Sequence, residues 1–289
     1  MIMSACCADC LLGKYLGKHP PGASRETVAA YQTRLRALIA EQTGLSAPEV
    51  VEQIEALHAS FFGPGQAFTG IKQHFNRLML SIEPRLTAAI ARADDPLRMA
   101  VQFAAAGNFI DFGAMTTVDE DKLRQFLDTA AAMQIDSALL ARLHHELLRA
   151  RSLVLFTDNC GEIVADKALL RVIGQMNPAL RITVIVRGQP ALNDATLEDA
   201  RQVGLDTVCH AVLGNGCGVA GTVLSRLPQD AAAAVTAADL LIAKGQGNYE
   251  SLCGCGLNLF YIFMCKCQLF VDRFGVPLYS GVITHEHPR

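Results

Sequence analysis

The chain has 289 residues, a net charge of -3 at pH 7 and an isoelectric point near 6.2. This acidic balance, without any run rich in lysine and arginine, argues against a general polyanion-binding protein, so we expect no nucleic-acid partner. The longest strongly apolar run, 259–265, is far too short to cross a bilayer, and 1–14 lacks the basic start and apolar core of a signal peptide. We therefore expect no membrane association and a cytoplasmic location that keeps the ten cysteines reduced.

The first half of the chain carries a helical pattern. Between Arg25 and Arg149, apolar residues recur at three- and four-residue spacing, and no segment reads convincingly as a strand. A loop is expected between Gly107 and Asp119. The predicted helices are 27–42, 47–62, 71–93, 97–106, 119–134 and 137–149.

After Ser152 the pattern changes to strands that alternate with loops and helices. Such alternation predicts a mainly parallel sheet covered by helices on both faces. The fold class is therefore α/β: a Rossmann-like three-layer core in residues 151–289, preceded by an all-helical region in residues 1–150. The predicted strands are 153–157, 182–187, 207–213, 240–243 and 259–264, with a last strand at 276–282.

Polar clusters follow three of these strands. Asp158-Asn159 lies where the first strand gives way to a helix, which has Glu162 in its first turn. Asn193-Asp194 is reached through the loop that starts at Arg187, and the segment 244–248 follows the fourth strand. Because ligands of open α/β sheets bind at the carboxyl ends of the strands, we expect the three clusters to converge on one crevice.

The side chains of these clusters suit a metal ion and a phosphate group. Asp158, Asn159 and Asp194 supply the carboxylate and amide oxygens that Mg²⁺ or Mn²⁺ prefers. Arg187 and Lys244 suit phosphate oxygens, and the glycines beside Lys244 let backbone N–H groups approach an anion. Any one of these pairs is more commonly a helix cap or a turn former. Three of them at equivalent positions favour a site.

The same segments carry a resemblance to a known family. Asp158-Asn-Cys-Gly-Glu-Ile, Asn193-Asp-Ala-Thr-Leu-Glu-Asp199 and Lys244-Gly-Gln-Gly-Asn-Tyr-Glu250 resemble the signatures of the domain-of-unknown-function 89 family, the metal-dependent damage-control phosphatases. Further matches are 107–111, the Cys-x-x-Cys of 7–10, which is similar to that of the stand-alone archaeal and bacterial branch, and 266–267. The chain departs from the family pattern at Cys160 and Ala165.

The resemblance implies a Rossmann-like core and hydrolysis of small phosphate esters, such as sugar phosphates or damaged phosphorylated metabolites, with a divalent cation (Mn, Co, Ni or Mg). Carried over, the metal ligands are Asp158, Asn159 and Asp194. The reaction would use Asp158, Lys244, Asp111 and Glu162, and the substrate would meet Asn108, Arg187, Asn193, Gly245 and Asn248.

The sequence leaves the reaction details open. A metal-bound water or Asp158 itself could attack the phosphorus atom. Asp111 and Glu162 suit a general base or leaving-group acid, and equally a role in orienting a ligand. Neither the substrate nor the oligomeric state follows from the sequence.

The cysteines and one glycine loop support two rival functions. A metal or redox sensor would use Cys7, Cys10 and Cys267, although Cys-x-Cys spacing is uncommon in zinc sites and packing is the favoured role. The loop 216–221 matches G-x-G-x-x-G, which would suit an S-adenosylmethionine-dependent carboxyl methyltransferase. This loop follows the third predicted strand rather than the first. We therefore prefer the interpretation that it is a turn that opens a helix at 219–227 over a cofactor-binding turn.

Overall fold

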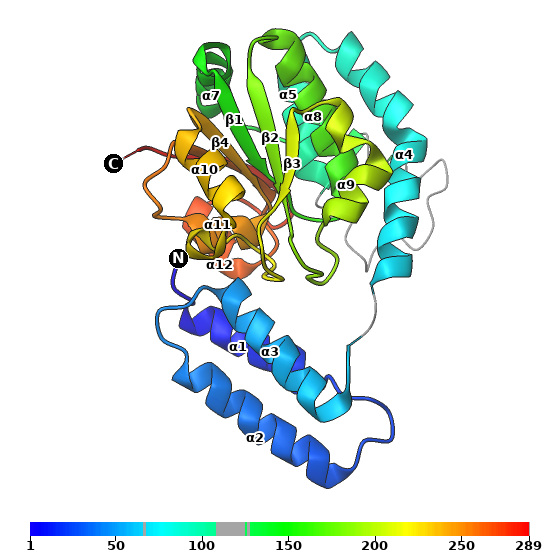
Figure 1. Ribbon diagram of the computed structural model, residues 1–289, viewed down its shortest axis with the longest axis vertical. Helices are drawn as coiled ribbons and strands as arrows, with labels where there is room; N and C mark the ends of the chain where they lie inside the picture. Colours follow the sequence, from blue (N-terminus) through cyan, green and yellow to red (C-terminus); the bar gives the residue numbers. More distant parts are fainter. Residues whose placement is uncertain (66–67, 108–124, 126–127, 289) are drawn as a thin grey trace.

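A six-stranded sheet forms the centre of the protein. The computed structural model describes residues 1–65, 68–107, 125 and 128–288. Its strand order is β3-β2-β1-β4-β5-β6, in which the first five strands in sequence are parallel and β6 is antiparallel to β5 (Figure 1). The predicted α/β class with a mainly parallel sheet is confirmed. The strands are β1 (Ser152–Phe156), β2 (Arg181–Val186), β3 (Ala211–Gly214), β4 (Leu240–Lys244), β5 (Leu259–Met264) and β6 (Gly281–Glu286).

The strand order reverses at β1. β1 pairs with β2 on one side and with β4 on the other, so Leu155 lies between Val184 and Ile242. The chain leaves β1 in one direction and later returns to its opposite edge. Loops at such a reversal diverge, and this is where open α/β sheets bind their ligands.

Helices cover both faces of the sheet because successive strand residues point to opposite sides. Leu153 and Leu155 of β1 join one apolar core, whereas Val154 and Phe156 join the other. The first core takes in α4 (Thr69–Arg92), α5 (Pro96–Ala106), α7 (Ser137–Arg149), α8 (Glu162–Met176) and α9 (Leu197–Val203). The second takes in α10 (Gln229–Ala237), α11 (Gln246–Leu252) and α12 (Gln268–Phe274).

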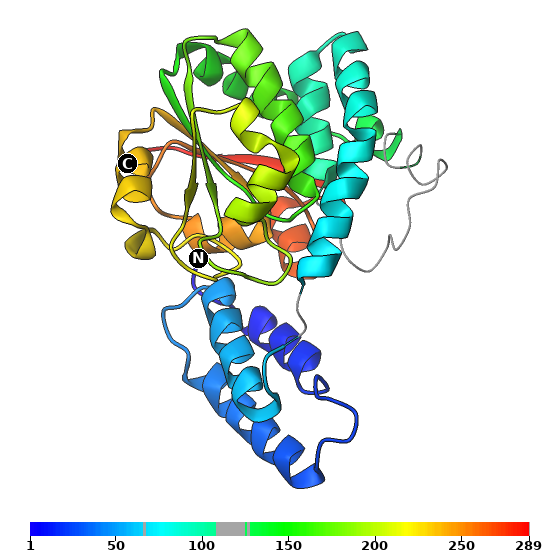
Figure 2. The same cartoon turned by 45° about the vertical axis from the view of Figure 1, so that its right-hand side comes forward.

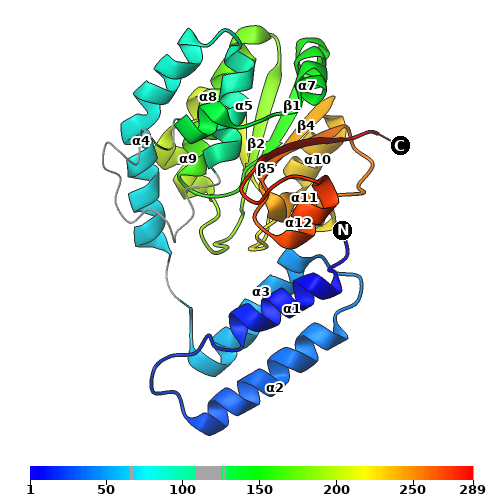
Figure 3. The ribbon, with the colours of Figure 1, turned by 180° about the vertical axis from the view of Figure 1, so that it is seen from behind.

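Three N-terminal helices form a separate bundle below the carboxyl ends of the strands (Figures 1 and 2). These are α1 (Ala5–Tyr15), α2 (Arg25–Glu41) and α3 (Ala47–Phe62), and they share a small core around Tyr31 and Leu35. Arg226 donates two hydrogen bonds to Glu52 of α3, at 2.6 and 2.9 Å, and so ties the bundle to the body. Seen from behind, α1 lies beneath α11 and α12 (Figure 3).

The boundary between the core of the N-terminal bundle and the core on the sheet therefore lies earlier in the chain than the first strand. Strands begin near residue 150, but α4, α5 and α7 precede that residue and pack on the sheet. The bundle core involves α1–α3 instead. The predicted division at residue 150 stays a prediction about folding units.

Several predicted elements differ from the structure. The helix expected at 219–227 is wrong: this segment is a loop that contains one 3-10 turn, Leu224–Arg226. The last strand begins at Gly281 rather than at residue 276, because left-handed φ angles at Gly275 (63°) and Tyr279 (65°) form a turn first. Half of the helix predicted at 119–134 lies outside the described residues, and within the other half 125 and 128–132 are helical. The helix α1 was not predicted.

Two glycines offer a matched test of this architecture. Gly188 follows β2 and packs directly on the backbone of Gly216, whereas a Cβ at Gly174 inside α8 would meet no atom within 4 Å. Gly188→Ala should lower the free energy of unfolding, because one backbone must move. Gly174→Ala should raise it by about 0.5–1 kcal/mol, as expected for a helix interior. Urea titrations of both variants measure these shifts, and equal shifts would contradict the close approach of the β2 and β3 loops.

Candidate active site

Backbone hydrogen bonds hold the loops after β1 and β2 together. The amide of Ala195 donates to the Asp158 carbonyl at 2.8 Å, and the amide of Cys160 donates to the Asn193 carbonyl at 2.9 Å. Asn159 and Asp194 thereby form an isolated β-bridge. The first two predicted clusters therefore meet at the carboxyl edge of the sheet.

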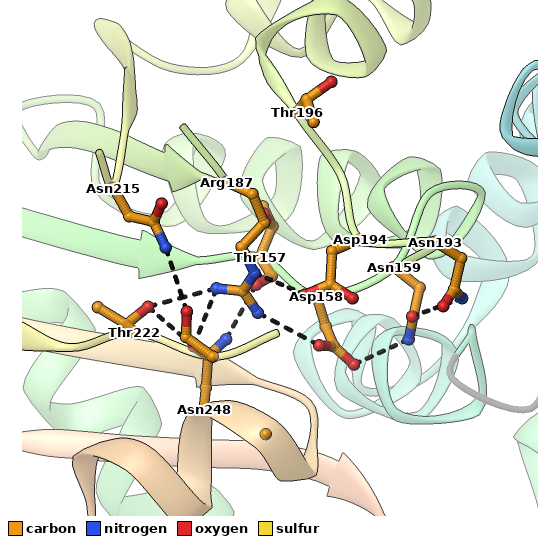
Figure 4. Close-up of polar contacts among 12 residues, drawn as sticks. Thr157, Asp158, Asn159, Arg187, Asn193, Asp194, Thr196, Asn215, Thr222 and Asn248 are labelled. Carbon is orange, nitrogen blue, oxygen red and sulfur yellow. Dashed lines mark hydrogen bonds and ion pairs between the residues drawn. The ribbon is translucent and has the colours of Figure 1, made fainter. Parts of the chain in front are cut away.

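Arg187 lies between the two aspartates of this site (Figure 4). Its Nε donates to Asp194 Oδ2 at 2.6 Å, and its Nη2 lies 3.5 Å from Asp158 Oδ1. Nη1 donates to Asn248 Oδ1 at 3.2 Å and to Thr222 Oγ1 at 3.3 Å. Since the side chain is only 1% exposed, Arg187 acts as a buried counterion of the aspartates.

The side-chain amide of Asn159 is held from both sides. Its Nδ2 donates to Asp158 Oδ2 at 2.8 Å and to Glu162 Oε2 at 3.1 Å, and its Oδ1 accepts from Asn193 Nδ2 at 2.7 Å. Asn193 and Glu162 therefore set the orientation of Asn159.

Asn76 of α4 anchors the loop after β1 to the neighbouring helices. Its Oδ1 accepts from the amide of Gly161 at 2.6 Å, while its Nδ2 donates to Asp199 and Gln202 of the α9 region. Gly161 has a φ of 74° and packs against Phe75. This fully buried asparagine fixes the loop that carries Asp158 and Asn159.

Lys244 lies in a buried cluster behind the crevice. Its ammonium donates to the Ala104 carbonyl at 2.8 Å, to Glu162 Oε1 at 2.7 Å and to Asp166 Oδ1 at 2.6 Å. Burial opposes the charged form, but Asp166 and Glu162 outweigh it and raise the pKa of Lys244. Lys244 is 0% exposed and uses all three donors inside the protein, so the structure does not place it at the crevice where a phosphate would bind.

Gly245 and Asn248, which were predicted to meet the substrate, make their contacts inside the protein. Gly245 has a φ of 80°, and a Cβ at this position would overlap the Asp158 carboxylate. The buried Asn248 donates to the carbonyls of Thr157 and Lys244, and its Oδ1 accepts from Arg187 and Thr222. Asn248 therefore joins the ends of β1 and β4.

The charges of the site are unbalanced. Four buried carboxylates, when ionised, face two buried cations, Arg187 and Lys244, which leaves a surplus of two negative charges. Burial raises the pKa of Asp158 and of Asp194, and burial raises the pKa of Asp166 to about 7. The four carboxylates are Asp158, Glu162, Asp166 and Asp194.

This donor set fits a hard divalent cation. Asp158 and Asp194 offer carboxylate oxygens, and Asn159 offers an amide oxygen, as Mg²⁺ and Mn²⁺ prefer. A divalent ion would also neutralise the surplus charge. Within the described part of the chain, no group of three or more His, Cys, Asp and Glu side chains could hold a metal ion. The candidate site therefore consists of two carboxylates and one amide.

Three residues near the site were not assigned a role from the sequence. Asp166 lies four residues after Glu162, and this helical spacing on α8 was the signal that both carboxylates share one face. The charge of the half-buried Lys266 lowers the pKa of Asp158, against the larger effect of burial. Thr222 comes from an irregular loop with no local signal. The predicted residues Asn108 and Asp111 lie outside the described residues.

The residues on which the two rival functions depend lie on other elements than the carboxylates. Cys7 is half-buried and Cys10 is exposed, both on α1, while Cys267 accepts a hydrogen bond from Gln246 at 3.7 Å. The loop 216–221 follows β3, which lies at the edge of the sheet rather than at its centre. Its surroundings therefore differ from those of a dinucleotide-binding turn.

Among the described helices, none combines the length and the apolar character that crossing a membrane requires.

The fold is also found in a solved structure. A crystal structure of a domain-of-unknown-function 89 family protein from Pyrococcus horikoshii superposes with a TM-score of 0.83. The match covers 99% of both chains at 23% sequence identity.

Sequence comparisons lead to the same family. A protein of Archaeoglobus fulgidus named damage-control phosphatase is 28% identical over 281 residues, which is 96% of each chain. A protein of Methanocaldococcus jannaschii named as uncharacterized is 32% identical over 75% of this chain and 72% of its own, and a Pyrococcus horikoshii damage-control phosphatase is 30% identical over 62% and 61%. The model of the damage-control phosphatase ARMT1-like domain matches residues 3–282, so the chain belongs to this family.

Proposed function

We propose that the protein is a divalent-metal-dependent phosphatase that hydrolyses small phosphate monoesters. The observation that carries the proposal is the meeting of two carboxylates and one amide, Asp158, Asp194 and Asn159, where the loops after β1 and β2 are joined and Arg187 binds both aspartates. Two relatives named damage-control phosphatase support the reaction class.

The residues that would hold the metal are Asp158, Asn159 and Asp194. When bound, the cation would polarise a phosphoryl oxygen and offset the negative charge that develops during transfer. Arg187 keeps both aspartates in place, and Glu162 and Asn193 hold the Asn159 amide. Gly245 lets the chain pass close beside the Asp158 carboxylate.

Lys266 takes the phosphate-binding role that the sequence suggested for Lys244. The amide of Lys266 donates to Gln246 Oε1 at 2.7 Å, and the neighbouring Gly245 lies against the Asp158 carboxylate. The half-buried Lys266 therefore follows β5 beside the site. An ammonium group here can pair with the phosphoryl oxygens that face away from the carboxylates. Lys244 instead offsets the charges of the buried Glu162 and Asp166.

Water is the preferred nucleophile in this arrangement. Asp158 has Arg187 near one carboxylate oxygen and accepts from Asn159 at the other, which favours a role as ligand over direct attack on phosphorus. Glu162 also uses both oxygens inside the protein, so it orients Asn159 rather than exchanging a proton with the substrate. A water oxygen would bond to phosphorus as the ester oxygen departs and takes up a proton. Asp111 keeps its predicted role as acid or base.

The metal requirement of turnover is the direct test. With Mn²⁺ or Mg²⁺ present, the protein should release phosphate from small esters, and EDTA should abolish this activity until metal is restored. Asp158→Asn and Asp194→Asn should each lower kcat/KM at least about a hundredfold, because each removes a charged ligand. Phosphate release by a coupled assay measures the change. Wild-type rates in either folded variant would exclude the site.

Metal binding should also show in thermal stability, without any substrate. The raised pKa values mean that folding favours the protonated carboxyls, so without metal these groups make the protein less stable as pH rises through those values. Metal competes with these protons, so the increase in Tm on adding Mn²⁺ should grow as the pH rises through the raised pKa values. The Asp158→Asn/Asp194→Asn double variant is the control. A pH-independent increase that persists in this variant would argue against metal binding here.

Lys244→Met separates a structural role from a phosphate contact. Removing the ammonium leaves Glu162 and Asp166 buried without their cation, so the free energy of unfolding should fall by about 3–5 kcal/mol. Adding Asp166→Leu to Lys244→Met should restore part of the loss, because one buried carboxylate is gone. Urea unfolding of both variants measures this. Unchanged stability together with a selective loss of turnover would show that Lys244 contacts the phosphate instead.

A further inference from the structure

Asn76 of α4 and Asp199 of α9 are two buried polar side chains that have no role in the reaction proposed above. Buried polar groups are costly unless they are hydrogen-bonded, so the partners of these two residues show what each of them holds in place. The Nδ2 of Asn76 donates to Asp199 Oδ1 at 2.9 Å. The pair therefore joins α4 to α9 beside the loops that follow β1 and β2.

Asn76 holds the loop after β1. Its Oδ1 accepts from the amide of Gly161 at 2.6 Å, and Gly161 lies two residues after Asn159. A Cβ at Gly161 would lie 3.3 Å from the Cβ of Phe75, so α4 and this loop pack closely. The loop therefore cannot move away from α4 without losing the hydrogen bond to Asn76.

Asp199 holds the loop after β2 in the same way. Its Oδ2 accepts from the amide of Thr196 at 2.9 Å and from the Thr196 hydroxyl at 2.7 Å, and Thr196 lies two residues after Asp194. Thr196 also forms an isolated β-bridge with Arg187, whose guanidinium binds both aspartates of the site. Asn76 and Asp199 therefore connect the two loops through side chains, in addition to the backbone hydrogen bonds between them.

Lys72 supplies the positive charge beside Asp199. Its ammonium pairs with Asp199 Oδ2 at 2.5 Å, and it precedes Asn76 by one turn on the same face of α4. Lys72, Asp199 and the loop 189–192 line a cavity of about 560 Å³ between α3 and the start of α4. Asn76 is fully buried and does not line this cavity, so it bonds Asp199 from the interior.

The amide at position 76 must accept a hydrogen bond on one side and donate on the other. Its oxygen faces an N–H group, whereas its nitrogen faces Asp199 Oδ1 and, at 2.8 Å, Gln202 Oε1. An ionised aspartate has the same shape but can only accept, so it would place a second carboxylate against Asp199. The direction of the hydrogen bond between positions 76 and 199 can thus be reversed without changing the shape of either side chain.

We propose that Asn76 and Asp199 are positioning residues, which set the separation of the metal ligands on the two loops. They contact neither the metal nor the substrate, and they act through Gly161 and Thr196. The inference rests on the proposed function and adds to it that metal affinity depends on an amide–carboxylate pair outside the ligand set.

Exchanging the two side chains tests this inference. Asn76→Asp and Asp199→Asn should each lower the affinity for Mn²⁺ about tenfold to a hundredfold, the loss expected when an outer partner of a metal ligand is removed. In the Asn76→Asp/Asp199→Asn double variant, the amide at 199 donates to the carboxylate at 76, and the net charge equals that of the wild type. Its affinity should recover to within about threefold of the wild-type value, because the two changes compensate. Titration calorimetry with Mn²⁺ alone measures all four proteins.

Glu83→Gln is the matched control on the same helix. Glu83 pairs with Lys167 and Arg171 of α8, at 3.0 and 3.1 Å, rather than with either loop. This variant should unfold at a lower temperature and keep the Mn²⁺ affinity of the wild type. Turnover gives a second measurement: at saturating Mn²⁺ the single variants should keep KM for a small phosphate ester within about twofold, because the substrate contacts are unchanged.

The outcomes separate the inference from the proposed function. If the wild type binds no divalent metal, the proposed function fails and the positioning role fails with it. If the wild type binds Mn²⁺ and the folded single variants bind it equally well, the proposed function stands and the positioning role is refuted. It is also refuted if the double variant binds as weakly as the single variants, or if Glu83→Gln loses as much affinity as they do. Circular dichroism verifies folding, and either single variant suffices if the other does not fold.

Discussion

The site depends on four carboxylates that are buried close together and that two buried cations, Arg187 and Lys244, bind directly. Arg187 draws Asp158 and Asp194 to one guanidinium, and Lys244 does the same for Glu162 and Asp166. Buried charges are stable only when they are paired and hydrogen-bonded, so the loops around them have little freedom. The hydrogen bonds of Asn248, the close approach of Gly245 and the capture of Gly161 by Asn76 all follow from this requirement.

The position of the cluster follows from the topology of the sheet. β1 is flanked by β2 and β4, so residues after three different strands reach the same edge without long connections. Because the two halves of each charge cluster come from separate segments, the charges assemble only when β1, β2 and β4 are in register. Folding therefore creates the proposed metal site, which the unfolded chain lacks.

Local sequence patterns predicted β1, β2, β4 and β5 closely, whereas β3 and β6 begin four and five residues later than predicted. The first two polar clusters were found because Asp and Asn directly follow apolar runs. The sequence did not reveal the surroundings of Lys244, since its partners on α8 and α5 are far away in the chain and burial is a property of the whole fold. The prediction of a helix at 219–227 was wrong for the opposite reason. Its apolar residues suggested a helix, but Gly218 and Gly221 pack against neighbouring backbone and the segment is a loop. Thr222, which binds Asn248, was hidden in that loop.

The loop after β2 also has an evolutionary consequence. Its residues 189–192 line the cavity, whereas 193 and 194 belong to the polar cluster. Substitutions in the first group can reshape the cavity while the contacts of Asn193 and Asp194 stay unchanged. The shape of the cavity and the charges of the polar cluster can therefore evolve independently, although one short segment carries both.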